Sequence, residues 1–257
     1  MQYNRLIMFC DYGLDDAIAT LHILKNAHMF NYIDIVPIGG NVDARTAYRN
    51  AHTLLKHAKA DKSKVRIVDT RTIKQYAADI PDVHGSDGIG DVLAPAPSDI
   101  PVIDYGAFAD ELKIKADPAR DCVLSLGPCT VPNMIGYVPF CTVLMGGTVN
   151  EQPNYGEYEF NEACDVQAFK AFAYKATAVA TLDTCHDKGF GFESFTMNDP
   201  LADRLIAKYV HMCNSRNAIV TVYDYVAALA VTNPEKFEAT RIKRPDGVEF
   251  NQLRIIN

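Results

Sequence analysis

The sequence has no surplus of basic residues and no long apolar run. It holds 25 Lys and Arg against 32 Asp and Glu, a formal net charge of −7 at pH 7. No stretch rich in Lys and Arg offsets this balance, so a nucleic-acid partner is not expected. No apolar run approaches the roughly 18 residues that a membrane span needs, and the N-terminal run ends at Asp11, too early for a signal peptide. We therefore expect no membrane partner.

The cysteines lack the spacing of a zinc site or a disulfide framework. There are seven, an odd number, and none forms a Cys-x-x-Cys pair. Such scattered cysteines are typical of a reducing compartment, so the sequence predicts a cytoplasmic location.

Short apolar runs alternate with amphipathic stretches along most of the chain. The apolar runs predict strands over residues 5–10, 33–38, 65–68, 122–126, 142–145 and 178–182. The amphipathic stretches predict helices over residues 17–27, 44–58, 108–114, 131–137, 166–174 and 201–213. This alternation predicts an α/β fold, a Rossmann-like open and mainly parallel sheet flanked by helices. No internal repeat or low-complexity linker divides the chain, so we expect a single domain over residues 1–257.

Irregular segments interrupt this pattern. Residues 84–101 and 146–159 are long loops, and loops of this length inside a compact domain usually have a function. Near the end of the chain, Pro245-Asp246-Gly247 predicts the turn of a small C-terminal hairpin.

Three carboxylates crowd the junction between the first strand and the helix after it. Asp11 follows the apolar run, and Asp15 and Asp16 fall in the first turn of the helix. Carboxylates cap helix N-termini and compensate the helix dipole, which would account for one or two of them. Three so close together repel one another unless a cation lies among them. The pattern therefore favours an oxygen-rich cation site over capping alone.

Other strand ends are expected at the same site, because ligands of doubly wound sheets bind outside the carboxyl ends of the strands. Later strands end in Gly39-Gly40-Asn41, Leu126-Gly127-Pro128 and Met145-Gly146-Gly147, where glycine lets a ligand approach the backbone closely. Asp224 opens a further helical pattern and supplies one more carboxylate at a helix start.

Taken in order, these residues resemble the calcium-dependent nucleoside hydrolases, the inosine-uridine-preferring N-ribohydrolases. The matching motifs spread from residue 5 to about residue 235 and follow the family's order. They are Asp11-Tyr12-Gly13-Leu14-Asp15-Asp16-Ala17, Gly40-Asn41 with Arg49-Asn50, His84-Gly85, Leu126-Gly127-Pro128-Cys129-Thr130, Met145-Gly146-Gly147, Glu159-Phe160-Asn161 with Asp165, Leu182-Asp183 with His186, and Asp224. Each motif is weak alone, whereas the ordered set is specific.

The resemblance implies hydrolysis of the N-glycosidic bond of a small-molecule ribonucleoside to free base and ribose, as in nucleoside salvage. It implies a Ca²⁺ ion held by Asp11, Asp16, Asp224 and the backbone carbonyl of Leu126. A calcium-bound water would attack the anomeric carbon, with Asp11 as the general base. Substrate contacts would come from Asp15, Asn41, Met145, Asn154, Glu159 and Asn161. Because the two ribose hydroxyls would complete the calcium coordination, 2′-deoxyribosides should be poor substrates. A dimer or tetramer is also implied.

The sequence departs from the family at three positions. Phe9 stands where an Asp is usual and Tyr12 where a Pro is usual. Tyr223 replaces a His that protonates the leaving purine in some members, and a Tyr with a reference pKa of about 10 is a weaker acid. The candidate acids are therefore Tyr223, His84 and His211, and the candidate contacts to the base are Tyr209, His211 and Phe192.

Two rival functions stay open at this point. A catalytically weak or inactive relative that only binds ribose or nucleosides would account for Phe9 and Tyr223. A phosphatase with an Asp nucleophile would need an Asp-x-Asp turn, but residue 13 is Gly, so this function is the least favoured.

Overall fold

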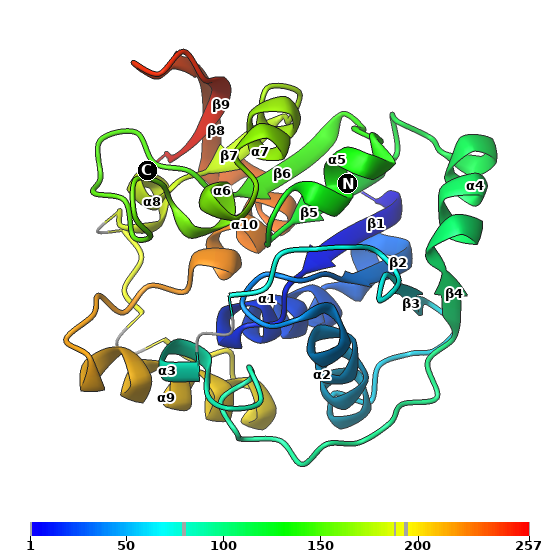
Figure 1. Cartoon of the computed structure of the whole chain (residues 1–257). Coiled ribbons are helices and arrows are strands. Elements are labelled where there is room, and N and C mark those ends of the chain that lie inside the picture. The colour runs from blue at the N-terminus through cyan, green and yellow to red at the C-terminus, as the bar shows by residue number, and fades with distance from the viewer. Residues whose placement is uncertain (1, 79–80, 188, 193–194, 257) are drawn as a thin grey trace.

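A nine-stranded sheet organises the chain, with the strand order β4-β3-β2-β1-β5-β6-β7-β9-β8 (Figure 1). The computed structural model describes residues 2–78, 81–187, 189–192 and 195–256. Neighbouring strands run parallel except β8 and β9, which form an antiparallel hairpin. The strands are β1 (Tyr3–Cys10), β2 (Phe30–Pro37), β3 (Val65–Asp69), β4 (Val102–Asp104), β5 (Asp121–Ser125), β6 (Cys141–Met145), β7 (Ala178–Ala180), β8 (Phe237–Lys243) and β9 (Glu249–Ile255).

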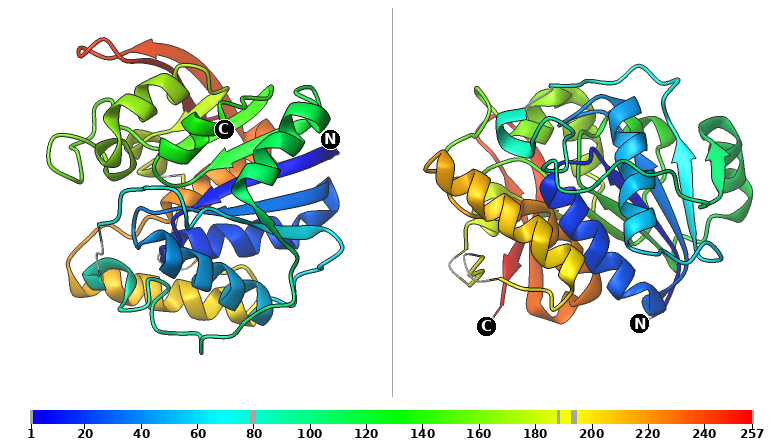
Figure 2. Two further views of the ribbon diagram at one scale, coloured as in Figure 1. Left: turned by 45° about the vertical axis from the view of Figure 1, so that its right-hand side comes forward. Right: turned by 90° about the horizontal axis from the view of Figure 1, so that it is seen from below.

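Helices cover both faces of this sheet, as the two views of Figure 2 show. They are α1 (Leu14–Lys25), α2 (Ala44–His57), α3 (Pro81–His84), α4 (Tyr105–Lys115), α5 (Thr130–Ile135), α6 (Phe160–Cys164), α7 (Val166–Ala173), α8 (Leu182–Cys185), α9 (Pro200–Ser215) and α10 (Tyr223–Thr232). Two 3₁₀ turns, η1 (Ala27–Met29) and η2 (Pro234–Lys236), precede β2 and β8. Within the described ranges, every helix is too short or too polar to cross a bilayer.

The core lies in two apolar layers, one on each face of the sheet. On β1, Leu6 and Met8 point into the layer that also holds apolar residues of α1, α2, α9 and α10. Ile7 and Phe9 point into the opposite layer, with Phe108 of α4 and Phe169 of α7. A strand buried on both faces reads as a continuous apolar run, which is why the central strands could be recognised in the sequence.

The structure confirms the predicted α/β fold and its C-terminal hairpin. The hairpin extends the main sheet, because β9 pairs with β7 through Val179 and Gln252. Strand β4 and the short helices α3, α6 and α8 were not predicted. Each has only three to five residues, too few to show a period.

Candidate active site

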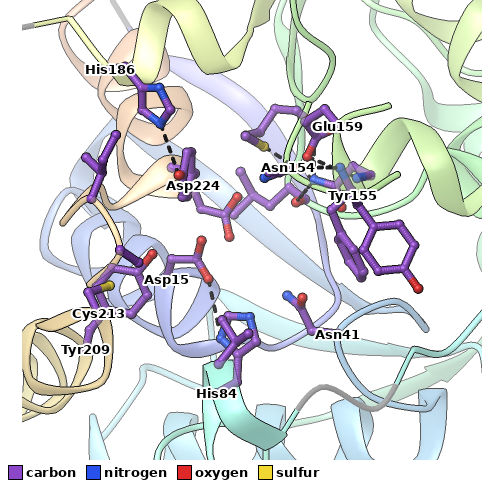
Figure 3. Close-up of a pocket in the computed structure, with 18 of the residues that line it drawn as sticks. Asp15, Asn41, His84, Asn154, Tyr155, Glu159, His186, Tyr209, Cys213 and Asp224 are labelled. Atoms are coloured by element: carbon purple, nitrogen blue, oxygen red, sulfur yellow. Dashed lines mark hydrogen bonds and ion pairs between the residues drawn. The ribbon is translucent and has the colours of Figure 1, made fainter. Parts of the chain in front are cut away.

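A cavity of about 430 Å³ lies at the carboxyl ends of the central strands (Figure 3). Asn41, Leu126 and Met145 line it from the segments at or just after the ends of β2, β5 and β6. Helices and loops supply the remaining lining residues, which are Asp15, Val83, His84, Asn154, Tyr155, Glu159, Phe160, Asn161, His186, Tyr209, Cys213, Arg216, Ala218, Ile219, Tyr223 and Asp224. Most of the predicted site residues therefore lie around one cavity.

Three buried carboxylates form an acidic cluster, of which Asp15 and Asp224 line the cavity and Asp16 lies behind them. One carboxylate oxygen from each of Asp15, Asp16 and Asp224 lies within 4.8 Å of the other two. Helices α1 and α10, which carry them, pack against each other. Burial, followed by repulsion from neighbouring acids, raises the pKa of Asp15 to about 7 and the pKa values of Asp16 and Asp224 well above their usual range. A cation at this point would stabilise the ionised cluster.

Asp11 lies next to the cluster but is not among the described residues that line the cavity. Its carboxylate is fully buried and accepts the backbone N–H of Asn41 at 2.8 Å and the side-chain amide of Asn41 at 3.0 Å. Its own backbone N–H donates to Oδ1 of Asp16 at 3.2 Å. Burial raises the pKa of Asp11 to about 6 despite these hydrogen bonds.

Asp16 also caps α1. Its Oδ2 accepts the backbone N–H of Gly13 at 2.8 Å, one of the donors that the start of a helix leaves without an intrahelical partner. The capping interpretation and the cation interpretation of the sequence are therefore compatible at this residue.

The donor atoms of the cluster fit a hard cation. They are all oxygens, the ligand type that Ca²⁺ and Mg²⁺ prefer. Oδ1 of Asp15 is buried and has no hydrogen-bond partner among the residues that the structure describes. The carbonyl of Leu126, at the cavity wall, accepts the amide of Asn161 at 2.8 Å and keeps a second lone pair. This cluster of acidic residues could bind a metal ion.

Polar residues before and within α6 form a second wall of the cavity. Glu159 is buried and accepts the backbone N–H groups of Gly147, Asn161 and Glu162, at 2.8, 3.0 and 3.1 Å. Burial nevertheless raises the pKa of Glu159 to about 7. Asn154 accepts the backbone N–H of Phe160 at 2.9 Å. These hydrogen bonds hold the side chains of Glu159 and Asn154 in place without a ligand.

Two of the three candidate acids, Tyr223 and His84, line the cavity. Nδ1 of His84 accepts the backbone N–H of Leu14 at 3.0 Å, which leaves the proton of the neutral ring on Nε2. Burial, and then the charge of Arg216, lowers the pKa of His84 to about 3. Burial raises the pKa of the Tyr223 hydroxyl. Both side chains therefore enter the site uncharged at neutral pH.

The structure places His211 away from the cavity, because this residue is exposed on α9 and is not among the lining residues. Tyr209 lines the cavity, and its hydroxyl donates to the carbonyl of Thr221 at 2.7 Å. Phe192 lies instead in an aromatic group with Phe190, Phe195 and Tyr225. Of the candidate contacts to the base, only Tyr209 is at the cavity in the described part of the chain.

Several lining residues had no role in the sequence analysis. His186 stood in a quoted motif without a function, while Tyr155, Cys213 and Arg216 gave no signal at all. Figure 3 shows His186 and Asp224 on one side of the cavity and Asn41 and His84 on another.

The chain matches known proteins in both sequence and structure. A family model described as inosine-uridine preferring nucleoside hydrolase matches residues 6–250. The chain is 30% identical over 128 residues to probable uridine nucleosidase 1 of Oryza sativa subsp. japonica, and 31% identical over 131 residues to uridine nucleosidase 1 of Arabidopsis thaliana. These alignments span 49% and 50% of this chain but only 39% and 38% of the two relatives.

Solved structures share the fold over nearly the whole chain. The purine-preferring ribonucleoside hydrolase from Gardnerella vaginalis superposes with a TM-score of 0.75 at 18% identity, covering 99% of this chain and 93% of that chain. The plant nucleoside hydrolase PpNRh1 superposes with a TM-score of 0.72 at 21% identity, covering 98% and 87%.

Proposed function

Because this chain belongs to the inosine-uridine preferring nucleoside hydrolase family, we propose that it hydrolyses the N-glycosidic bond of ribonucleosides to free base and ribose. The observation that carries the proposal is the cavity with Asp15 and Asp224 at its floor and Glu159 in its wall. Cleavage of an N-ribosidic bond builds positive charge on the sugar. Carboxylates fixed around that sugar stabilise the transition state more than the substrate.

Ca²⁺ fits the acidic floor in this proposal, held by Asp11, Asp16, Asp224 and the carbonyl of Leu126. An oxygen-only donor set supports a hard cation here. The carboxylate oxygens that converge are those of Asp15, Asp16 and Asp224, and Asp11 adjoins this cluster through its hydrogen bond to Asp16. When bound, the ion would offset the repulsion among the carboxylates and lower the pKa of nearby water.

The site residues of the chain have separate roles in this proposal. Asp11, whose carboxylate is buried beside the acidic cluster, accepts the proton of the attacking water. Asp15, Asn154, Glu159 and Asn161 hold the ribose hydroxyls, with Asn41 and Met145 beside them. Tyr223 donates a proton to the departing base, and the Nε2–H of His84 is available as a further hydrogen-bond donor.

The test is ribose release from a panel of ribonucleosides, measured as reducing sugar with and without a chelator. Uridine and inosine head the panel because the matching family is described as inosine-uridine preferring and the two plant relatives are named uridine nucleosidases. We expect chelator-sensitive release from at least one ribonucleoside and little from its 2′-deoxy form. Calcium binding without release from any nucleoside would instead favour a binding protein without catalytic activity.

A further inference from the structure

His186 and Tyr223 meet at the cavity from two different helices. Nε2 of His186, just after α8, lies 3.1 Å from the hydroxyl of Tyr223, the first residue of α10. Both side chains line the cavity, and Figure 3 marks the contact of His186 with a dashed line. A lone contact of this kind would mean little, but here both partners are held in place by their surroundings.

The backbone fixes each partner. The N–H of His186 donates to the carbonyl of Leu182 at 2.8 Å, and Thr184 ties α8 to β9 through the carbonyl of Leu253 at 2.6 Å. The thiol of Cys185 lies 3.8 Å from the carbonyl of Tyr223, so α8 also contacts the start of α10. The imidazole and the phenol therefore face each other without needing a ligand to assemble them.

The other nitrogen of His186 faces an acid. Nδ1 lies 3.6 Å from Oε2 of Glu151 and, within the described residues, makes no hydrogen bond. A carboxylate only accepts hydrogen bonds, so this contact is attractive when Nδ1 carries a proton. An Nε2–H that donates to the oxygen of Tyr223 would leave the single O–H of Tyr223 free to donate into the cavity.

We infer that His186 is a positioning residue for Tyr223, orienting its hydroxyl toward the leaving base and returning its proton. This inference rests on the proposed function. As the C–N bond breaks, its electron pair goes to the base nitrogen, which takes the proton of Tyr223. The Nε2 proton of His186 passes to the oxygen of Tyr223, so that no charged phenolate remains. The attacking water supplies the hydroxyl that ribose gains and gives its other proton to Asp11.

The test compares two leaving groups in steady-state kinetics with the calcium-loaded protein. Uridine releases a base that needs a proton, whereas 4-nitrophenyl β-D-ribofuranoside releases a stable phenolate that does not. For His186→Ala we expect kcat on uridine to fall about 10²-fold, within the range of general acid catalysis, with KM little changed. The kcat on the aryl riboside should stay within about threefold of wild type, because this substrate bypasses the acid.

Four further variants test the same inference. Tyr223→Phe should also lose kcat on uridine and keep kcat on the aryl riboside. A variant with both His186→Ala and Tyr223→Phe should have a kcat on uridine no lower than that of Tyr223→Phe alone. His186→Gln retains an N–H donor but cannot return a proton, so it should restore only part of the uridine rate. His28→Ala, an exposed histidine in η1, is the matched control and should behave as wild type.

Equal losses of kcat on both substrates in His186→Ala would mean that His186 has a purely structural role and would overturn the inference. An unchanged or increased rate on uridine would also overturn it, because Tyr223 would then be donating to His186 and not to the base. If the wild type released ribose from neither substrate, the proposed function itself would fail, and the inference about His186 would fail with it. Thermal unfolding of each variant identifies losses that come from misfolding.

Discussion

Gly40 lies directly against the carboxylate of Asp11. A Cβ built on Gly40 would overlap Oδ2 of Asp11 and stand 2.7 Å from Cδ of Pro128. The same Asp11 oxygen accepts the backbone N–H of Asn41 at 2.8 Å, and a Cβ on Gly127 would stand 2.9 Å from Cγ of Asp11, so the buried carboxylate is enclosed on more than one side. The glycine beyond β2 therefore determines where the proposed base can lie.

Gly40→Ala should displace Asp11 and lower kcat for ribose release by about 10²-fold, the effect of a misplacement near 1 Å. Overpacking at this buried point should also reduce the free energy of unfolding by about 1–3 kcal/mol. Steady-state kinetics and urea unfolding measure the two effects. Gly191→Ala is the control, because the described residues leave open space within 4 Å of a Cβ there. Wild-type turnover in Gly40→Ala would show that the position of Asp11 is not critical.

Asp11 and Asp15 should respond differently to removal of their charge. Asp11→Asn keeps the shape of the side chain and removes the base, so kcat should fall by about 10²–10⁴-fold. Asp15→Asn weakens the proposed grip on ribose and should raise KM more than it lowers kcat. Michaelis–Menten parameters for the two variants on one nucleoside test this division. If Asp15→Asn lost kcat and Asp11→Asn did not, the two roles would have to be exchanged.

Calcium should stabilise the fold by relieving the repulsion within the acidic cluster. At about a hundredfold excess over Kd, a ligand that binds only the folded state adds about 2.7 kcal/mol, which raises Tm by roughly 5–10 °C in a chain of this size. Asp224→Asn removes one of the three clustered carboxylates and should abolish most of this increase. Asp110→Asn, exposed on α4, should leave it unchanged. Equal Tm values with CaCl₂ and with a chelator would argue against a calcium site.

The sequence predicted well whatever depends on local pattern. The buried strands and the longer helices were recognisable because their apolar periods extend over enough residues. The rule that parallel strands deliver their ends to one edge of the sheet predicted that Asn41, Leu126 and Met145 would lie together, and all three line the cavity. The position of Asp224 beside the carboxylates of α1 was implied by the family resemblance alone.

What the sequence could not predict depends on contacts between distant segments. His186 reaches Tyr223 only because α8 packs beside α10, and no spacing in the sequence encodes that contact. Tyr12 is another case. It is fully buried in the core with a φ of 49°, a backbone conformation that the proline expected at this position cannot adopt.

His22 should make the stability depend on pH below neutrality. Burial, and then the charge of Lys25, lowers the pKa of His22 to about 4, and its Nε2 lies 2.8 Å from the hydroxyl of Thr232. The unfolded chain takes up this proton near pH 6.5, before the folded chain does. The contribution of His22 is therefore complete above about pH 6.5 and is lost as the pH falls toward 4, by up to about 3 kcal/mol.

His22→Gln should remove this part of the acid sensitivity, because glutamine can bond Thr232 but does not titrate. Urea unfolding at pH 7 and pH 4.5, in the presence of a chelator, should show a smaller loss of free energy for His22→Gln than for wild type. His57→Gln changes an exposed histidine on α2 and should keep the wild-type loss. His84 is also buried, with a pKa lowered to about 3. Part of the loss of unfolding free energy in acid should therefore remain in the wild type, in His22→Gln and in His57→Gln. An identical loss in His22→Gln and wild type would mean that His22 takes up its proton equally easily in the folded and unfolded chains.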